Sequence, residues 1–191
     1  MELQSIGIDL GKTVFHLIGL DQRGRVVVRK RFSRSELLRF TSNLRVELIG
    51  MEACGGAQFL GRALQQQRHQ VRLMLAQYVK PFVKTNKNDY IDAEAIAEAV
   101  TRPTMRFVPI KTDDQLDMQS LHRMRKRWVM RRTVVVNQLR GLLLERGITL
   151  RKGRRHVDAA LPEILEDATS KLSGALRMLI AQLNDHQLKV R

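Results

Sequence analysis

The 191-residue sequence is poor in cysteine, with only Cys54, and poor in proline and aromatic residues. A single cysteine excludes an internal disulfide and a multi-cysteine zinc site, and it is typical of a reducing, cytosolic compartment. The five histidines show no metal-ligand spacing.

No apolar run approaches the roughly 18–20 residues that span a bilayer. The first residues lack the basic stretch of a signal peptide. We therefore expect no membrane partner.

Acidic residues are also scarce, with 19 Asp and Glu against 34 Lys and Arg, which gives a net charge of +15. The stretch from His122 to Arg155 contains twelve basic residues and only one acid, Glu145, and thus carries +11 of this charge. A solvated helix face usually mixes both signs, so this stretch is expected to bind a polyanion. The residues predicted to contact nucleic acid are Arg123, Arg125, Lys126, Arg127, Arg131, Arg132, Arg140, Arg151, Lys152, Arg154 and Arg155.

The first half of the sequence predicts an α/β fold. Residues 4–32 read as three short strands in an antiparallel meander, followed by helix and strand in alternation. The expected strands that follow are 46–51 and 71–75, and the expected helices are 33–44, 57–68 and a last one that ends at Ala99. Asn86 or Asn88 would cap this last, alanine-rich helix, whose small side chains would allow close approach to the sheet. The pattern predicts a mixed sheet with flanking helices.

The pattern changes after Pro103, where an almost uninterrupted helix is expected from about Thr112 to Arg146. Such a length is unusual in a globular domain and indicates a coiled coil or an arm. Two further helices are expected at 156–167 and 172–190. The predicted domains are 1–110, a long basic helix at 111–150, and C-terminal helices at 151–191 that would lead into an absent second domain.

Two acidic residues are expected on the sheet. Asp9 lies in the middle of an apolar strand, where an unpaired carboxylate is costly. Its same-face neighbours Gly7 and Gly11 would clear space beside it for a metal ion and a phosphate. Glu52 follows the strand 46–51 and has Gly50 on its own face.

Two more acids, Asp89 and Asp92, are three residues apart on one helix and thus project from one face. Together with Asp9 and Glu52 they would supply hard oxygen ligands, which suit Mg²⁺ or Mn²⁺ far better than zinc. Such a site can hold two metal ions for phosphoryl transfer. Taken singly, Asp92 could be a solvated helix residue, Asp89 a cap and Glu52 a loop acid.

Three motifs occur in order: Gly7-Ile-Asp-Leu-Gly-Lys12, Met51-Glu-Ala-Cys-Gly-Gly56 and Lys87-Asn-Asp-Tyr-Ile-Asp-Ala-Glu94. With Val79-Lys-Pro-Phe before the last motif and the long basic helix after it, this set resembles the DEDD-type transposases of insertion-sequence family 110, relatives of the Piv DNA invertase. The resemblance runs through most of the chain.

The resemblance implies an RNase H-like fold of the RuvC type and places Asp9, Glu52, Asp89 and Asp92 at the family's D, E, D and D positions. It also implies Mg²⁺, DNA transposition or site-specific recombination guided by a structured bridge RNA, and dimers or tetramers assembled through the long helix. The expected location is the bacterial or archaeal cytoplasm, at the nucleoid. Family members continue into a second domain with a catalytic serine, and we expect this chain to stop before it.

Two other functions fit parts of the sequence. Gly7-Ile-Asp-Leu-Gly-Lys-Thr13 also resembles the first phosphate loop of actin-like and sugar-kinase ATPases, although the chain is too short for both lobes of such a protein. A non-catalytic module that binds nucleic acid and oligomerises is the stronger alternative, since the basic helix would suffice for it. Metal dependence discriminates between this module and an enzyme.

Overall fold

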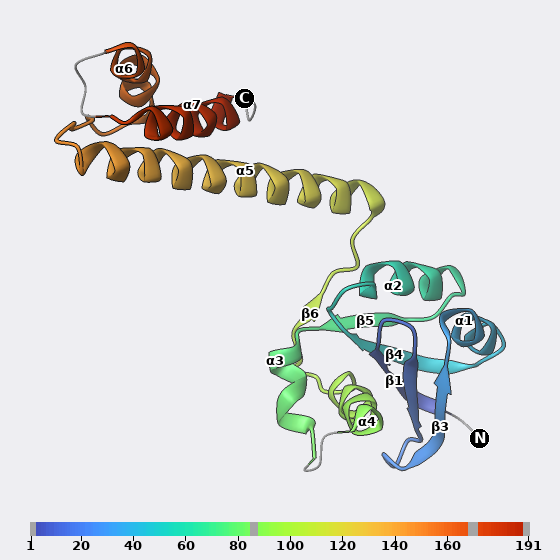
Figure 1. The fold of residues 1–191 in the computed structure, drawn as a ribbon. Coiled ribbons are helices and arrows are strands. Elements are labelled where there is room, and N and C mark those ends of the chain that lie inside the picture. Colours follow the sequence, from blue (N-terminus) through green and yellow to red (C-terminus); the bar gives the residue numbers. More distant parts are fainter. Residues whose placement is uncertain (1–2, 85–87, 168–171, 189–191) are drawn as a thin grey trace. The chain divides into compact units, whose positions relative to one another are not determined.

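The computed structural model describes residues 3–84, 88–167 and 172–188, and the chain forms two compact units, Met1–Thr112 and Asp113–Arg191 (Figure 1). They are called the first and second unit below. The alternative cap Asn86 and the chain end at Arg191 lie outside the described residues.

A six-stranded mixed sheet forms the first unit, in the order β3-β2-β1-β4-β5-β6. The first three strands form the expected antiparallel meander, β4 and β5 join it in parallel, and β6 pairs antiparallel with β5. The strands are β1 (Leu3–Leu10), β2 (Phe15–Leu20), β3 (Val26–Phe32), β4 (Val46–Glu52), β5 (Val71–Met74) and β6 (Phe107–Val108). The predicted mixed sheet is confirmed, and only the two-residue β6 was not expected.

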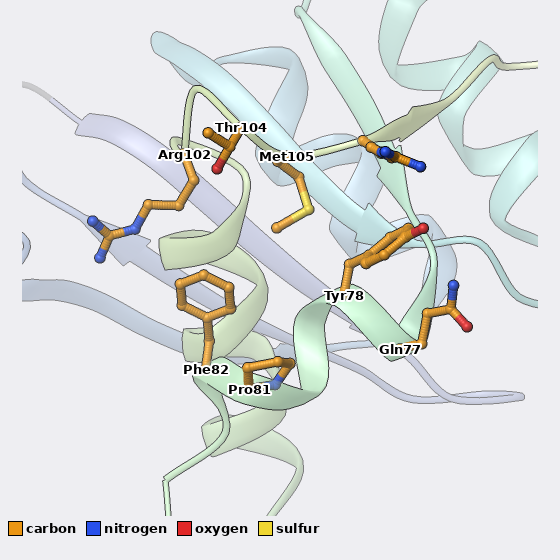
Figure 2. A pocket seen from close by; sticks show the side chains of 8 residues that line it. Gln77, Tyr78, Pro81, Phe82, Arg102, Thr104 and Met105 are labelled. Carbon is orange, nitrogen blue, oxygen red and sulfur yellow. The ribbon is translucent and has the colours of Figure 1, made fainter.

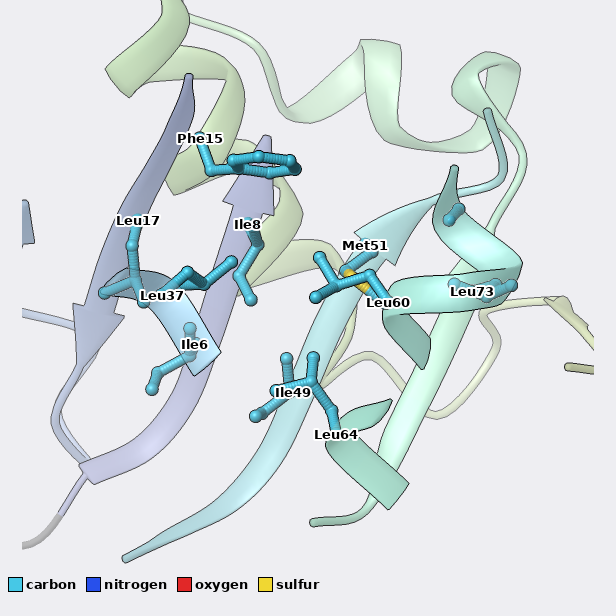
Figure 3. Packing of buried hydrophobic residues seen from close by; sticks show 11 residues of the cluster. Ile6, Ile8, Phe15, Leu17, Leu37, Ile49, Met51, Leu60, Leu64 and Leu73 are labelled. Carbon is cyan, nitrogen blue, oxygen red and sulfur yellow. The ribbon is translucent and has the colours of Figure 1, made fainter. Parts of the chain in front are cut away.

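One face of this sheet is covered by α1 (Arg34–Ser42) and α2 (Ala57–Gln66) (Figures 1 and 3). The predicted capping box starts α1, since Glu36 accepts a hydrogen bond of 2.8 Å from the backbone N–H of Ser33. Leucines of both helices pack on alternate residues of β1, β2 and β4, and each such buried side chain contributes roughly 1.5–3 kcal/mol. The fully buried members shown include Ile6, Ile8, Leu17, Leu37, Ile49, Met51, Leu60 and Leu64.

The opposite face is covered by α4 (Asp89–Ala99), which begins at Asn88, the second of the two expected caps. The Asn88 side chain accepts a hydrogen bond of 3.0 Å from the N–H of Tyr90. A Cβ on Gly7 would lie 2.0 Å from the carbonyl oxygen of Ala93, so the backbones of α4 and β1 are in direct contact at this point. The predicted close approach of an alanine-rich helix is thereby confirmed.

The same contact corrects the role expected for the glycines beside Asp9. The space beside Gly7 is filled by the backbone of α4, and a Cβ on Gly11 would lie 2.3 Å from the carbonyl oxygen of Val14. Gly50 likewise lies against Val100. The three glycines therefore make room for α4, for a tight turn and for the Val100 side chain, and the space beside each of them is not open to a ligand.

Replacing Gly7 with Ala is expected to destabilise the first unit by about 3 kcal/mol or more, because a backbone contact cannot yield as a side chain can. Urea unfolding of the variant measures this loss. Gly55→Ala is the matched control, since a Cβ there meets no atom within 4 Å. Equal stability of the two variants would contradict the close packing of α4.

A short connection between β5 and α4 contains α3 (Ala76–Val79) and η1 (Lys80–Phe82), to which the sequence assigned no element. Val79 is buried in a cluster with Met74, Ile96 and Val100, and Phe82 packs against the same cluster. These contacts fix the connection beside the sheet.

The second unit consists of α5 (Asp113–Leu144), α6 (Arg154–Glu166) and α7 (Gly174–Leu188). The long helix and the two shorter ones match the sequence prediction within two residues at the described ends. Val136, Leu139 and Leu143 of α5 are buried with residues of α6 and α7, whereas 121–131 are exposed. Among the described helices, none combines the length and apolar composition needed to cross a bilayer.

Candidate metal and nucleic-acid sites

Two acids stand side by side at the ends of adjacent parallel strands. The register pairs Ile8 of β1 with Met51 of β4, so the next residues are Asp9 and Glu52. Ile8 and Met51 are buried on the face covered by α1 and α2, and alternation along each strand turns Asp9 and Glu52 toward α4. The strand pairing therefore positions both carboxylates on one face of the sheet.

The other two acids lie in the first turn of α4, which packs on this same face. Asp92 joins Asp9 and Glu52 in lining a cleft of about 530 Å³. Asp89 is not among the residues that line it, and 66% of its side chain is exposed. Three of the four predicted residues therefore share one cleft, and the fourth, Asp89, lies beside His16 of β2.

Negative charge is concentrated around Asp9. Burial, followed by the negative charges of Asp92 and Asp89, raises the pKa of Asp9, while His16 and the N–H of Leu10 act in the opposite direction. The ionised form of Asp9 is thus disfavoured, and a bound cation would stabilise it.

His16 is a neighbour of the acids that the sequence prediction missed. It pairs with Asp9 across the β1–β2 hairpin, and its Nδ1 lies 3.5 Å from Oδ2 of Asp89. Its ring meets Tyr90 edge-on with a centroid distance of 4.7 Å, and its side chain is only 13% exposed. The hairpin register was the available signal, because a tight turn between residues 10 and 15 brings residues 9 and 16 opposite each other.

Two lysines line the same cleft as the acids. Lys80 and Lys84 line it together with Gln77, and all three belong to the α3–η1 connection or follow it directly. Nζ of Lys84 lies 2.6 Å from Glu94, and this contact raises the pKa of Lys84. Lys80 is exposed, so it offers a positive charge beside the carboxylates.

The donor set fits a hard divalent cation, because Asp9, Glu52 and Asp92 offer only carboxylate oxygens within one cleft. In the described part of the chain, however, no three His, Cys, Asp or Glu side chains are placed as a group that could hold a metal ion. Cys54 lies on the exposed segment after Glu52, and the pKa of its thiol is raised by burial and by the charges of Glu52 and Asp9.

The predicted nucleic-acid-binding residues all belong to the second unit. Arg123, Arg125, Lys126, Arg127 and Arg131 are exposed along α5, and Arg132 is partly exposed. Arg151, Lys152 and Arg155 are exposed in or after the turn that precedes α6.

Arg140 and Arg154 are held by polar contacts within the second unit. Arg140 donates hydrogen bonds of 3.0 Å to the carbonyl oxygens of Arg151 and Gly153, which fixes the α5–α6 turn. Arg154 pairs with Asp158 at 2.9 Å. These two side chains are therefore less available to a phosphate than the exposed arginines of α5.

The order and direction of the strands, with helices on both faces, define the first unit as an RNase H-like α/β fold. The family follows from a direct comparison: the model for DEDD transposases of the IS110 type, described as "Transposase", matches residues 6–147. The chain belongs to this family of enzymes. This membership argues against the actin-like ATPase considered above.

Curated relatives support this assignment. The chain is 44% identical over 183 residues to a transposase for insertion sequence element IS1328 from Yersinia enterocolitica, covering 95% of this chain and 53% of that protein. It is 42% identical over 186 residues to a probable family 20 transposase from Pseudomonas aeruginosa, covering 97% and 55%. The chain thus spans about half the length of the curated relatives it matches.

Among solved structures, T. thermophilus RuvC in complex with a Holliday junction substrate aligns with a TM-score of 0.42 at 14% identity, covering 55% of this chain and 98% of RuvC. A glucokinase of the ROK family from Streptomyces griseus aligns with a TM-score of 0.31 at 16% identity, covering 41% of this chain and 35% of that enzyme.

Proposed function

We propose that this chain supplies the metal-dependent part of a DNA transposase or site-specific recombinase that is guided by a structured RNA in the cytoplasm. The observation that carries the proposal is the cleft lined by Asp9, Glu52 and Asp92 together with Lys80 and Lys84. Acids and lysines in one cleft suit a phosphodiester that contacts both a cation bound by the acids and the ammonium groups of the lysines.

In this proposal Asp9, Glu52, Asp89 and Asp92 hold Mg²⁺ or Mn²⁺, and their side chains draw together when they do so. The bound metal would activate a nucleophile and stabilise the leaving oxygen. Lys80 would attract and orient the phosphate, while α4 holds two of the carboxylates at a fixed height above the sheet.

The site is proposed to be composite, because the chain spans about half the length of its curated relatives. A serine nucleophile would come from a second domain, and no serine of this chain is assigned to that role. The chain's own residues would position the phosphate for it.

The second unit is proposed to bind DNA and guide RNA through α5 and to form a dimer or tetramer through the same helix. Support comes from exposed apolar side chains interspersed among the arginines. Met118, Leu121, Met124 and Trp128 are each more than two-fifths exposed, which suits a coiled coil that buries them against a second copy.

Calorimetric titration of Mn²⁺ into the chain tests the metal site. Glu52→Gln is expected to weaken Mn²⁺ binding by more than the roughly 10–100-fold that loss of an outer-shell partner costs. Glu47→Gln is the matched control, since Glu47 is an exposed residue of the same strand, and it should bind as the wild type does. Failure of the wild type to bind Mn²⁺ would favour the non-catalytic nucleic-acid-binding module.

A further inference from the structure

A second pocket lies next to the acidic cleft and takes no part in the proposed metal chemistry. It has a volume of about 480 Å³, within the roughly 300–1,000 Å³ of ligand pockets. It is shaped by α3, η1 and the segment that follows α4 (Figure 2). Its lining residues are Gln77, Tyr78, Pro81, Phe82, Arg102, Thr104, Met105 and Arg106. Gln77 also lines the acidic cleft, so the two spaces adjoin.

The lining combines three kinds of chemistry. Tyr78 and Phe82 stand on opposite sides of the space and Met105 points toward it, as Figure 2 shows. These are surfaces on which a planar ring can stack. Gln77 and Thr104 offer a side-chain amide and a hydroxyl for hydrogen bonds to the edge of such a ring.

The charges of the lining suit an anion. Arg102 and Arg106 are both exposed, Arg102 is paired with Glu98 outside the lining, and none of the eight described residues that line the pocket is acidic. The neighbouring cleft, in contrast, is lined by three carboxylates. A phosphate can therefore approach this pocket without a metal ion.

The walls of the pocket are held in place. Phe82 and Met105 pack against the buried cluster around Val79, and Pro81 limits the backbone freedom of η1. The guanidinium of Arg102 lies 5.6 Å from the ring centroid of Phe82 and is paired with Glu98. A ligand would thus find its stacking surfaces already ordered, which reduces the entropy cost of binding.

We propose that this pocket receives one unpaired nucleobase of the DNA strand whose backbone continues into the acidic cleft. The inference rests on the proposed function, because the shared lining residue Gln77 places the pocket beside the cleft in which that function puts the DNA backbone. Every base has a face that stacks on aromatic side chains, and the adjacent phosphate would be met by Arg106. An RNA strand is the competing occupant.

The test uses the 191-residue chain and a DNA duplex with one unpaired 2-aminopurine, whose fluorescence is quenched when it stacks. The wild type is expected to quench it, and Tyr78→Leu is expected to lose most of the quench and to bind at least about fivefold more weakly. Phe59→Leu is the aromatic control, because Phe59 is 51% exposed and does not line the pocket.

A second pair of variants keeps the test valid if Tyr78→Leu folds poorly. Exposed Arg106 is replaced by Ala and compared with Arg45→Ala, an exposed arginine outside the pocket. Only Arg106→Ala should weaken binding. Equal quenching by all variants, no quenching by the wild type, or tighter binding of a matched RNA would overturn the proposal.

Wild-type protein in EDTA separates this inference from the metal site. It should still quench 2-aminopurine without a metal ion, because none of the described residues that line the second pocket is acidic. Persistent quenching alongside absent Mn²⁺ binding by the wild type would overturn the proposed function and leave the base pocket supported.

Discussion

Asp9→Asn is expected to raise the melting temperature of the metal-free chain at neutral pH. Burial and the charges of Asp92 and Asp89 raise the pKa of Asp9 in the folded state, so its ionisation opposes folding. Stability is lost as the pH rises from the ordinary Asp pKa through this raised value. The gain on substitution should therefore be largest at neutral pH and vanish at acid pH, where the carboxyl is protonated in both states.

The same variant is expected to lose its response to Mg²⁺ or Mn²⁺. At a metal concentration of 100 times Kd, a ligand that binds only the folded state stabilises it by about 2.7 kcal/mol. For a domain of this size that shifts the melting temperature by several degrees. Thermal melting in EDTA and in excess metal measures both effects.

Asp21→Asn is a control for which the melting temperature is expected to change in the opposite direction. Hydrogen bonds from Arg25 and Arg23 lower the pKa of Asp21, so its charge favours folding. Its removal should lower the melting temperature in EDTA and leave the metal response intact. If Asp9→Asn melts below the wild type at neutral pH in EDTA, the raised pKa of Asp9 is contradicted. If the variant gains as much from metal as the wild type does, the acidic cleft is not the metal site.

Neutralising three arginines of α5 is expected to weaken DNA binding and flatten its salt dependence. Arg123, Arg127 and Arg131 are exposed and four residues apart, so they lie along one helix face. Each arginine placed on a duplex phosphate adds about −0.9 to the slope of log K against log salt. Replacing all three with Gln should reduce the slope by up to about 2.7. Fluorescence anisotropy of a labelled duplex at several salt concentrations measures it.

The matched control replaces Arg23, Arg39 and Arg45 with Gln. These are exposed arginines of the first unit, and their removal changes the net charge by the same amount. The slope should then stay close to that of the wild type. Equal losses in the two triple variants would show that net charge, and not α5, governs binding.

Local sequence patterns predicted most of the elements correctly. The alternation of apolar residues in the first three strands, the Ser33–Glu36 cap and the small residues of α4 are signals that depend only on near neighbours. The convergence of Asp9 and Glu52 was also predictable, since both follow apolar strand residues that pair in register.

Features that depend on tertiary packing were not predictable in this way. The α3–η1 connection is short, has weak helical periodicity and is held mainly by the burial of Val79. The sequence predicts open space for a ligand at the glycines beside Asp9, because it does not show which element packs against them. Gly7 in fact lies under Ala93 and Ala97.

The contact at Gly7 also affects how variants of the acids should be interpreted. Because α4 rests on β1 through main-chain atoms, the spacing between the strand and the first turn of α4 is set by the backbone. Exchanging a carboxylate for an amide at Asp9 or Asp92 leaves that frame in place. Such variants therefore change the charge of the acidic cleft without changing its backbone geometry. A side chain added at Gly7 would shift α4 and alter both the geometry and the electrostatics of the cleft.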